Sequence, residues 1–260
     1  MANHNMDTEG RIRVGVLALQ GAFREHVAAL ESVGGCVASE VRTPAQLDDC
    51  DALVMPGGES TAIEKLAREN GLWEALETWV RDGRPTWGTC AGMILLSKAV
   101  ASGEATGGQG RLGGLAIEVA RNYFGKQVRS FQQELDVKEL GKRPYTAVFI
   151  RAPAVVSWAP EVSVLATVSA ARKRKRTDDT GAGAPVKCGD GGAAEGVDVA
   201  VAGSVSGYVQ RPGAVAVAVR HGNLMGTAFH PELTSDHRWH AEFLRMARAA
   251  AATAPSPTRT

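Results

Sequence analysis

The stretch "RPTWGTCAGMILLSKAV" (Arg84–Val100) indicates how this chain folds. An apolar run reaches Gly88, a single cysteine stands two residues later, and an apolar pattern of helical spacing follows. A strand that turns directly into a helix over one residue holds that residue in a strained, exposed conformation, and small neighbours relieve the crowding. The stretch therefore predicts a strand, a tight turn at Cys90 and a helix from Ala91 to Val100.

The residues before this stretch alternate between the patterns of strands and helices. Apolar, β-branched runs alternate with amphipathic segments that end at glycine. Such alternation predicts an α/β fold with three layers, in which a mostly parallel central sheet lies between flanking helices. The predicted strands are 11–19, 36–42 and 51–58, and the predicted helices are 21–35, 59–71 and 72–83.

The second half of the chain has strand patterns with few helices between them. This difference predicts antiparallel or mixed pairing at the edge of the same sheet. "AVAVAVRHGNLMGTAFH" (Ala214–His230) has the pattern of a hairpin closed by Gly222 and Asn223, and an amphipathic helix follows at 236–252. The other predicted strands are 112–122, 126–140, 145–153 and 161–169.

The domain organisation follows from the same patterns. We predict a single domain at 11–251, between a flexible N-terminus at 1–10 and a flexible tail at 252–260. At about 170–213 the chain is rich in glycine, alanine and charge and lacks periodicity, so a disordered insertion is expected there. The basic run "RKRKR" (Arg172–Arg176) in this insertion has two interpretations. One is a nuclear signal or a contact for a polyanion, and the favoured one is a solvated loop.

Charge and composition exclude several classes of protein. The 29 basic and 28 acidic residues give no electrostatic reason to expect nucleic acid or an anionic membrane as a partner. No apolar run is long enough to span a bilayer, and the polar N-terminus lacks the apolar stretch of a signal peptide. The four cysteines form no CxxC pair, which is typical of a reducing compartment rather than of a disulfide framework or a zinc site. We therefore expect a soluble cytoplasmic protein.

Cys90 and the motif "HPE" supply candidates for nucleophilic catalysis. A helix N-terminus favours a thiolate, so Cys90 is a candidate nucleophile, with a buried structural cysteine as the alternative. Pro231 holds His230 extended at the end of a strand. Residues two apart share a face there, so Glu232 can orient the imidazole as the third member of a triad. The alternative is a surface loop.

The motif "VMPGGES" (Val54–Ser60) ends a predicted strand and begins a helix. Glycine lets a backbone N–H approach a ligand closely, so the amide of Gly58 can stabilise an oxyanion together with the amide of Ala91. The alternative is a turn in which Ser60 caps the helix, and both interpretations can hold together.

Together these motifs resemble the triad class of glutamine amidotransferases, also called class I. Within that class the sequence is most similar to the glutaminase subunits of pyridoxal 5′-phosphate synthase. The resemblance implies a flavodoxin-like, class I amidotransferase fold. The segments that carry it are "GVLALQGAFREH", "MPGGEST", "GTCAGMILLSK", "ARNYFGKQVRSFQQEL", "FIRAP" and "TAFHPELTSDHRWH".

The resemblance implies a reaction. Cys90 would attack the side-chain carboxamide of L-glutamine, and the γ-glutamyl thioester would be hydrolysed to glutamate. His230 would act as general base and then protonate the departing ammonia, while Glu232 holds His230. The amides of Gly58 and Ala91 would form the oxyanion hole.

The resemblance also assigns the glutamine-binding positions. An arginine is chemically sensible among them, because the α-carboxylate of the substrate needs a cationic partner. For Arg121 and Arg151, the two arginines among the implied positions, the alternative from the sequence alone is that they form ordinary surface salt bridges. The implied positions are Gly58, Glu59, Ser60, Arg121, Ile150 and Arg151.

A partner is implied as well. The ammonia would pass to a synthase subunit, a (β/α)₈ barrel that builds the pyridoxal phosphate ring. The resemblance implies no metal and no organic cofactor for this subunit. The implied contact with the barrel consists of Gln20, Gly21, Arg24, Glu25 and His26.

Three alternatives stay open at the level of sequence. The chain could be the glutaminase subunit of another amidotransferase pathway. It could be a different cysteine hydrolase with the same turn, such as a peptidase. A non-catalytic binding or regulatory protein on the same scaffold is the third alternative.

Overall fold

The computed structural model describes residues 11–101, 110–124, 130–169, 208–209 and 214–253. The predicted flexible ends, apart from residues 252 and 253, lie outside the described residues, as does nearly all of the predicted insertion with its basic run. The division into one domain with an insertion therefore stays a prediction. Within the described part of the chain, no helix has the length and hydropathy to cross a bilayer.

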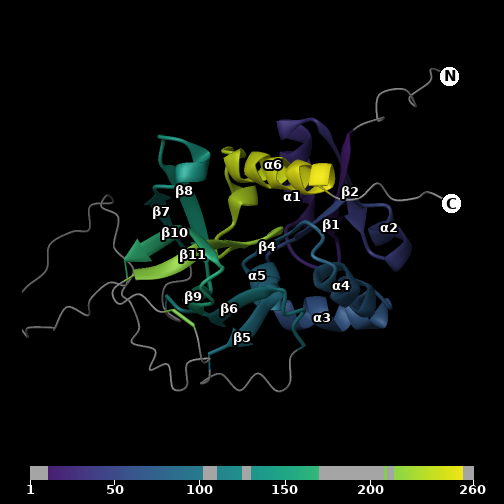
Figure 1. Cartoon of the computed structure of the whole chain (residues 1–260), viewed down its shortest axis with the longest axis horizontal. Helices are drawn as coiled ribbons and strands as arrows, with labels where there is room; N and C mark the ends of the chain where they lie inside the picture. The colour runs from purple at the N-terminus through teal and green to yellow at the C-terminus, as the bar shows by residue number, and fades with distance from the viewer. Residues whose placement is uncertain (1–10, 102–109, 125–129, 170–207, 210–213, 254–260) are drawn as a thin grey trace, which may run out of the picture.

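A ten-stranded sheet forms the middle layer (Figure 1). In spatial order its strands are β2 (Cys36–Val41), β1 (Ile12–Leu17), β3 (Ala52–Met55), β4 (Thr86–Thr89), β12 (Leu224–Thr227), β11 (Ala214–His221), β9 (Ala154–Trp158), β6 (Leu115–Ala120) and β5 (Ser97–Val100). Beside this path β10 (Ser163–Ser169) pairs with β11, and β7 (Ser130–Leu135) and β8 (Tyr145–Ile150) form a separate pair.

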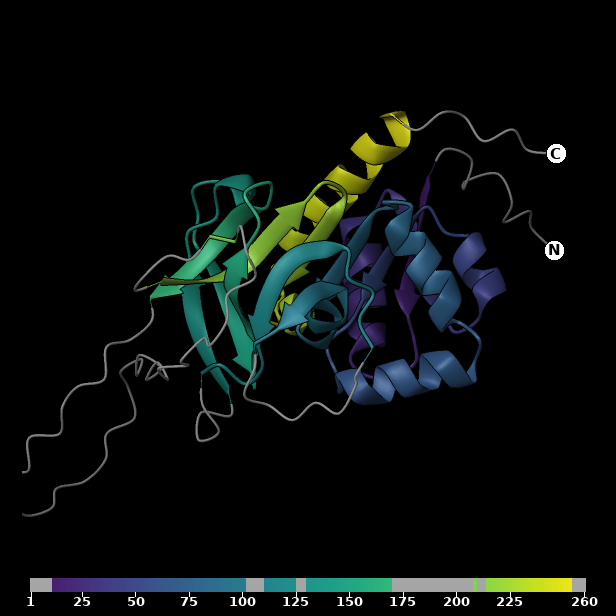
Figure 2. The same ribbon diagram turned by 60° about the horizontal axis from the view of Figure 1, so that its bottom comes forward.

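The strand pairings divide the molecule into two halves. From β2 to β12 every neighbouring pair is parallel. We call β2, β1, β3 and β4 the parallel half. We call β6 to β11 the antiparallel half, because β11 runs antiparallel to β12, β10 and β9, and β9 runs antiparallel to β6. Figure 2 shows these two halves side by side, and β12 joins them because it pairs with both β4 and β11.

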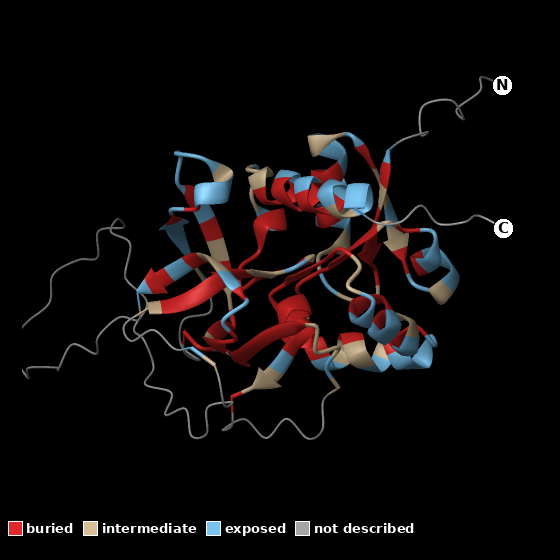
Figure 3. Cartoon of the chain, in the orientation of Figure 1, coloured by how far each residue is buried: buried red, intermediate tan, exposed pale blue. Residues whose placement is uncertain are grey.

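Helices cover both faces of the sheet. In Figure 1 α1 and α6 lie over one face, and α3, α4 and α5 lie over the other. The strands between them are buried on both sides (Figure 3), as apolar parallel strands require. The helices are α1 (Phe23–Val33), α2 (Pro44–Asp48), α3 (Ser60–Glu69), α4 (Trp73–Arg81), α5 (Ala91–Leu96) and α6 (Arg238–Thr253), with the 3₁₀ turns η1 (Lys138–Leu140) and η2 (Pro231–Leu233).

The predicted three-layer α/β fold with its mostly parallel sheet is confirmed, and the boundaries differ in informative ways. The helix predicted to reach Val100 ends at Leu96, where Ser97 turns to extended backbone and its hydroxyl donates to the carbonyl of Ile94. The rest of that segment is β5, which pairs with β6. Distant strand pairing therefore outweighs a local apolar pattern that suits a helix.

Two further features were not predicted. The helix α2 begins with a capping box between Thr43 and Gln46, a signal that its sequence carries. The strand β9 lies inside the sheet between β11 and β6. The predicted antiparallel pairing is present, and it includes the interior strands β9 and β11.

Candidate active site

Cys90 stands at the junction of β4 and α5 in a strained backbone conformation. Its φ of 47° and ψ of −101° belong to a region that residues with a side chain rarely adopt. A Cβ on Gly88 would lie 2.5 Å from the carbonyl carbon of Gly92, and a Cβ on Gly92 would lie 2.0 Å from the carbonyl oxygen of Met55. Both glycines are therefore required for β3, β4 and α5 to pack this closely around the cysteine.

The strand register brings His230 to Cys90 across 140 residues of sequence. Thr89 and Thr227 are partners in the parallel pair of β4 and β12, and the amide of Cys90 donates to the carbonyl of Thr227 at 2.7 Å. The carboxyl ends of parallel strands meet at one edge of a sheet, which is where ligands bind in such folds. His230, three residues beyond Thr227, therefore lies at the same edge as Cys90.

His230 and Glu232 form a buried pair on η2. Nδ1 of His230 lies 2.7 Å from Oε1 of Glu232, and the amide of His230 is held by the carbonyl of Val148 on β8 at 2.8 Å. Burial acts to lower the pKa of His230, but the contacts with the Cys90 thiol and the Glu232 carboxylate outweigh it and raise that pKa to about 10. The arrangement thus favours a proton on the imidazole and places a base next to the sulfur of Cys90, as nucleophilic catalysis by cysteine requires.

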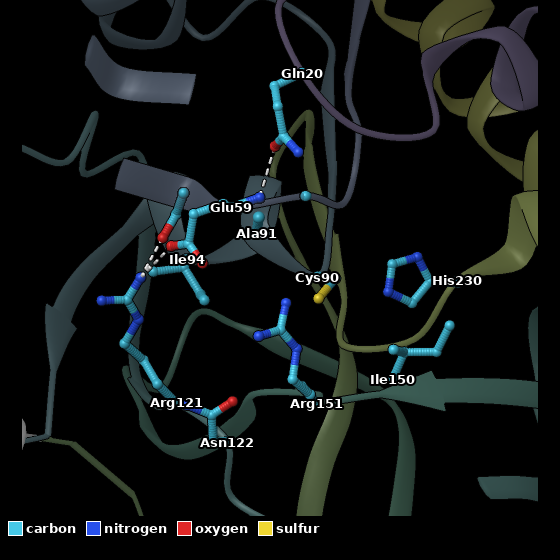
Figure 4. Close-up of a pocket in the computed structure, with 12 residues that line it drawn as sticks. Gln20, Glu59, Cys90, Ala91, Ile94, Arg121, Asn122, Ile150, Arg151 and His230 are labelled. Carbon is cyan, nitrogen blue, oxygen red and sulfur yellow. Dashed lines mark hydrogen bonds and ion pairs between the residues drawn. The ribbon is translucent and has the colours of Figure 1, made fainter. Parts of the chain in front are cut away.

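The loop after β3 contacts this pair directly. A Cβ on Gly57 would lie 2.4 Å from Cε1 of His230 and 3.3 Å from the Cβ of Cys90, so a side chain at this position would displace the imidazole. The side-chain oxygen of Gln20 accepts a hydrogen bond from the amide of Glu59 at 2.6 Å (Figure 4). A Cβ on Gly58 would meet the same oxygen at 2.3 Å. Gln20 therefore fixes the loop that carries the predicted oxyanion donor.

A cavity of about 360 Å³ opens above Cys90. It contains every residue predicted for glutamine binding, both predicted oxyanion donors and two members of the predicted triad. The sequence prediction missed Ile94, although it lies one helical turn after Cys90, and Asn122, although it follows Arg121. The lining residues are Gln20, Gly58, Glu59, Ser60, Cys90, Ala91, Ile94, Arg121, Asn122, Ile150, Arg151 and His230.

Backbone strain is concentrated at this cavity. Among the described residues, three other than glycine have positive φ, namely Cys90 at 47°, Asn122 at 47° and Arg151 at 44°, and all three line it. Such conformations persist where the surrounding structure over-determines them, and they cluster at functional sites. The cavity is therefore distinguished by its backbone as well as by its side chains.

Arg121 reaches the cavity from the loop after β6. Its guanidinium donates to the hydroxyl of Ser60 and lies 3.8 Å from Oε1 of Glu59 (Figure 4). The interpretation of Ser60 as a helix cap is wrong, because Glu59 occupies the cap position and no side chain caps the helix. The hydroxyl of Ser60 accepts from Arg121 instead, and Arg121 thereby gains a fixed place beside the cavity.

The segment predicted to contact a partner divides into two groups. Gly21, Arg24 and Glu25 are exposed and Gln20 is partly exposed, so they are accessible. The assignment of His26 to that surface is wrong, because its side chain has no exposure and contacts Glu232 in the interior. Helical spacing places His26 on the apolar face of α1, which encloses it.

The three described cysteines differ in their surroundings. Cys36 and Cys50 are packed in the core, where burial raises the pKa of each thiol. Cys90 lines the cavity beside His230 and is the described cysteine with an adjacent base. The alternative of a merely structural cysteine therefore fits Cys36 and Cys50 better than Cys90.

Comparisons with known proteins agree with this geometry. Residues 16–173 match the SNO glutamine amidotransferase family. The chain is 41% identical over 245 residues to a probable pyridoxal 5′-phosphate synthase subunit PDX2 of Arabidopsis thaliana, which covers 90% of this chain and 86% of the relative. It is 44% identical over 241 residues to the pyridoxal 5′-phosphate synthase subunit PdxT of Acidothermus cellulolyticus, with 93% and 96% of the two chains covered.

A solved structure is also similar. A crystal structure of a glutamine amidotransferase superposes with a TM-score of 0.66 at 37% identity, and the match covers 90% of this chain and 98% of the other. Sequence and fold thus agree with the cysteine, histidine and glutamate that the structure brings together. The chain belongs to the SNO glutamine amidotransferase family.

Proposed function

We propose that this chain is the glutaminase subunit of a pyridoxal 5′-phosphate synthase, which hydrolyses L-glutamine and supplies ammonia for vitamin B6 synthesis. The observation that carries the proposal is the line from Cys90 through His230 to Glu232 at the floor of a cavity sized for a small molecule. Identity above 40% to subunits with that name supports the choice of pathway.

The proposed reaction uses the triad in two steps. The thiolate of Cys90 attacks the carboxamide carbon of glutamine, and the new oxyanion accepts hydrogen bonds from the amides of Gly58 and Ala91. His230 then gives its proton to the leaving nitrogen, so that the C–N bond breaks and ammonia departs from a γ-glutamyl thioester. Next His230 takes a proton from water, the resulting hydroxide attacks the thioester carbon, and the C–S bond breaks, so that glutamate leaves and the thiolate of Cys90 re-forms beside the protonated His230. Glu232 holds the imidazole throughout.

The other lining residues bind the substrate in this proposal. The cations of Arg121 and Arg151 pair with the α-carboxylate of glutamine. Glu59 and Ser60 hold Arg121 in place and, with Ile150, line the remainder of the pocket. No group of three described histidine, cysteine or acidic side chains is placed to hold a metal ion, and the proposed chemistry uses none.

The proposed partner is a synthase subunit with a (β/α)₈ barrel, to which the ammonia passes. Gln20, Gly21, Arg24 and Glu25 are the proposed contact surface. The same segment holds the oxyanion loop through the bond from Gln20 to the amide of Glu59, so docking there can order the donors that catalysis needs. The free state of the described cysteines fits the cytoplasm, which we propose as the compartment.

Release of glutamate from glutamine tests the proposal. The full chain is assayed alone and with the synthase subunit, beside Cys90→Ala and the matched control Cys36→Ala. We expect the partner to raise turnover, Cys90→Ala to abolish it and Cys36→Ala to leave it within about twofold of wild type, since Cys36 is remote from the cavity. Turnover by Cys90→Ala equal to wild type would sink the mechanism.

The assay also separates the alternatives. Activation by the synthase subunit of a different amidotransferase pathway, without activation by the barrel, would replace the proposed partner. Cleavage of peptides without release of glutamate from glutamine would indicate a different cysteine hydrolase. Absence of any turnover with every partner would favour a binding or regulatory protein.

A further inference from the structure

The carboxylate of Glu232 has two oxygens, and the triad uses one of them. Oε1 faces His230, whereas Oε2 is buried and accepts no well-directed hydrogen bond among the described residues. Nε2 of His26 lies 3.3 Å from Oε2, and neither side chain has any exposure to solvent. A buried carboxylate oxygen without a donor is costly, so the ring that faces it matters.

His26 links three elements at this point. It extends from α1, and its Nε2 also lies 3.3 Å from the hydroxyl of Thr89, the residue before the nucleophile. Its Nδ1 lies 3.0 Å from Nε2 of His240 on α6. The indole of Trp87 packs edge-on against both imidazoles, with ring centroids 5.5 and 5.0 Å away. The contacts with Thr89, His240 and Trp87 thus fix the position of the His26 ring, and the ring can in turn restrict the position of the Glu232 carboxylate.

Two proton arrangements are compatible with two neutral imidazoles. In the first, Nε2 of His26 carries the proton, with the hydroxyl of Thr89 as its hydrogen-bond acceptor and Oε2 of Glu232 also 3.3 Å away, while Nε2 of His240 donates to Nδ1 of His26. In the second, Nδ1 of His26 donates to His240, and the lone pair on Nε2 of His26 faces the carboxylate. Burial lowers the pKa of His26 well below its usual value and that of His240 to about 3, so both rings are neutral at physiological pH.

Electrostatics and hydrogen-bond accounting favour the first arrangement. The second lets the hydroxyl of Thr89 donate to Nε2 of His26, but it places the lone pair of that nitrogen 3.3 Å from a negative oxygen. It also leaves the N–H at Nδ1 of His240 buried without an acceptor, because that nitrogen has no partner among the described residues. The first leaves only a lone pair unsatisfied at that nitrogen, and it places the positive end of an N–H, instead of a lone pair, 3.3 Å from Oε2 of Glu232.

We propose that His26 is a positioning residue of the triad: its Nε2–H, held by the hydroxyl of Thr89 and in a tautomer set by His240, faces Oε2 of Glu232 and so stabilises the carboxylate that orients His230. The inference rests on the proposed function. In this inference α1 connects the partner to the triad, because the proposed partner contact at 20–25 continues directly into the helix that carries His26. Docking there reaches the triad at Glu232 as well as at the oxyanion loop.

Amide substitutions separate the two nitrogens of the ring. The amide of His26→Gln reaches the position of Nε2 and keeps a donor for Glu232, whereas that of His26→Asn reaches only Nδ1. With the synthase subunit present, we expect His26→Asn to lower the kcat for glutamate release about tenfold or more with KM within about twofold. We expect His26→Gln to stay within about threefold of wild type.

His237→Gln is the matched control. It lies in the turn just before α6, the helix that carries His240, with ring centroids 5.8 Å apart, and no contact between it and Glu232 is found in the described part of the chain, so we expect wild-type turnover. Equal losses of kcat in His26→Asn and His26→Gln would overturn the proposal, because packing alone would then explain the role of His26. Wild-type kcat in His26→Asn would overturn it too.

A measurement on the unaltered chain covers the case in which the variants do not fold. Long-range proton–nitrogen correlation spectra of the full chain with nitrogen-15-labelled histidine report the tautomer of each ring. We expect the Nε2–H form for His26 at neutral pH, and the Nδ1–H form would overturn the proposal. If the wild-type complex released no glutamate, the proposed function would fail, while the tautomer would still decide the role of His26.

Discussion

The two halves of the molecule contribute different things to one cavity. The parallel half supplies backbone: the strained turn at Cys90, the amide of Ala91 and the glycine loop at 57–58. The antiparallel half supplies charged side chains from loops, such as Arg121 after β6 and Arg151 after β8. His230 and Glu232 follow β12, the strand that joins the halves. Backbone groups can act only if the strands around them hold them in fixed positions, which the parallel half provides. Long charged side chains can extend into the cavity from loops, which the antiparallel half provides.

The largest expected effect comes from the joint between the halves. Glu232→Gln leaves the shape of the carboxylate and removes its charge, so it no longer stabilises the imidazolium of His230. By analogy with triads in which the acid becomes an amide, we expect kcat to fall about a thousandfold with KM little changed. Steady-state release of glutamate in the presence of the synthase subunit is the measurement.

Glu134→Gln is the control for this variant, because Glu134 is an exposed carboxylate on β7 and lies outside the cavity. It should keep wild-type turnover. A kcat for Glu232→Gln equal to that of Glu134→Gln would mean that the charge beside His230 has no part in the reaction. The proposed role of the segment after β12, which links the two halves, would then be wrong.

The parallel half could be predicted closely because its signals are local. Each strand and helix there has its own hydrophobic periodicity, and the glycines around Cys90 predict a tight turn from the local sequence alone. The motif "HPE" is local in the same way. His230 lies beside Cys90 because of the register of β12 with β4. The sequence does not show this register, and the two residues were assigned to one site only by combining the motifs that contain them.

The antiparallel half could not be predicted as well, because its structure depends on distant partners. The strand β5, which borders this half and pairs in parallel with β6, depends on that partner, because its local apolar pattern indicated a helix. Arg121 and Arg151 were identified through a resemblance, since the positive φ of Arg151 leaves no trace in the neighbouring letters. His26 could have been placed correctly, because Phe23 and Leu30 lie on the same side of α1.

The rigidity of the parallel half can be tested at Gly92. A Cβ there would lie 2.0 Å from the carbonyl oxygen of Met55, and backbone cannot rotate out of the way. We expect Gly92→Ala to lower the free energy of unfolding by about 3 kcal/mol in urea denaturation. The control is Gly222→Asn in the hairpin turn, where φ is 58° and no atom lies within 4 Å of the added Cβ. Equal stability of the two variants would contradict the close packing described for the turn at Cys90.

The contact between α1 and α6 gives the stability a distinct pH dependence. Burial lowers the pKa of His240 to about 3, so between pH 3 and 6.5 the unfolded chain binds a proton at His240 that the native chain does not bind. Stability therefore decreases as the pH falls through this range, and we expect His240 to account for about 2 kcal/mol between pH 7 and 5. His230, whose raised pKa has the opposite sign, is present in every variant and cancels in the comparison.

The measurement is the change in the free energy of unfolding from pH 7 to 5 in wild type and in His240→Gln. The variant should lose less stability than wild type over this interval. His237→Gln, which removes a less buried ring from the turn just before the same helix, is the control and should follow wild type. An identical pH dependence in His240→Gln and wild type would mean that His240 is not held neutral in the native chain.

The smallest expected effect tests whether the antiparallel half binds substrate without taking part in chemistry. Arg121 is fixed by Ser60 and Glu59 at the wall of the cavity, away from the thiol, so its cation acts on the ground state and the transition state alike. We expect Arg121→Met to raise the KM for glutamine about tenfold with kcat within about threefold, as loss of uniform binding predicts.

Arg143→Met removes an equally long cation from the same half, where it pairs with Asp236 at 3.0 Å outside this cavity, and should leave KM unchanged. A fall in the kcat of Arg121→Met as large as the rise in KM would place Arg121 in the transition state. The antiparallel half would then contribute to catalysis as well as to binding. The remaining difference between the halves would be that the strained residue of the parallel half, Cys90, is the nucleophile.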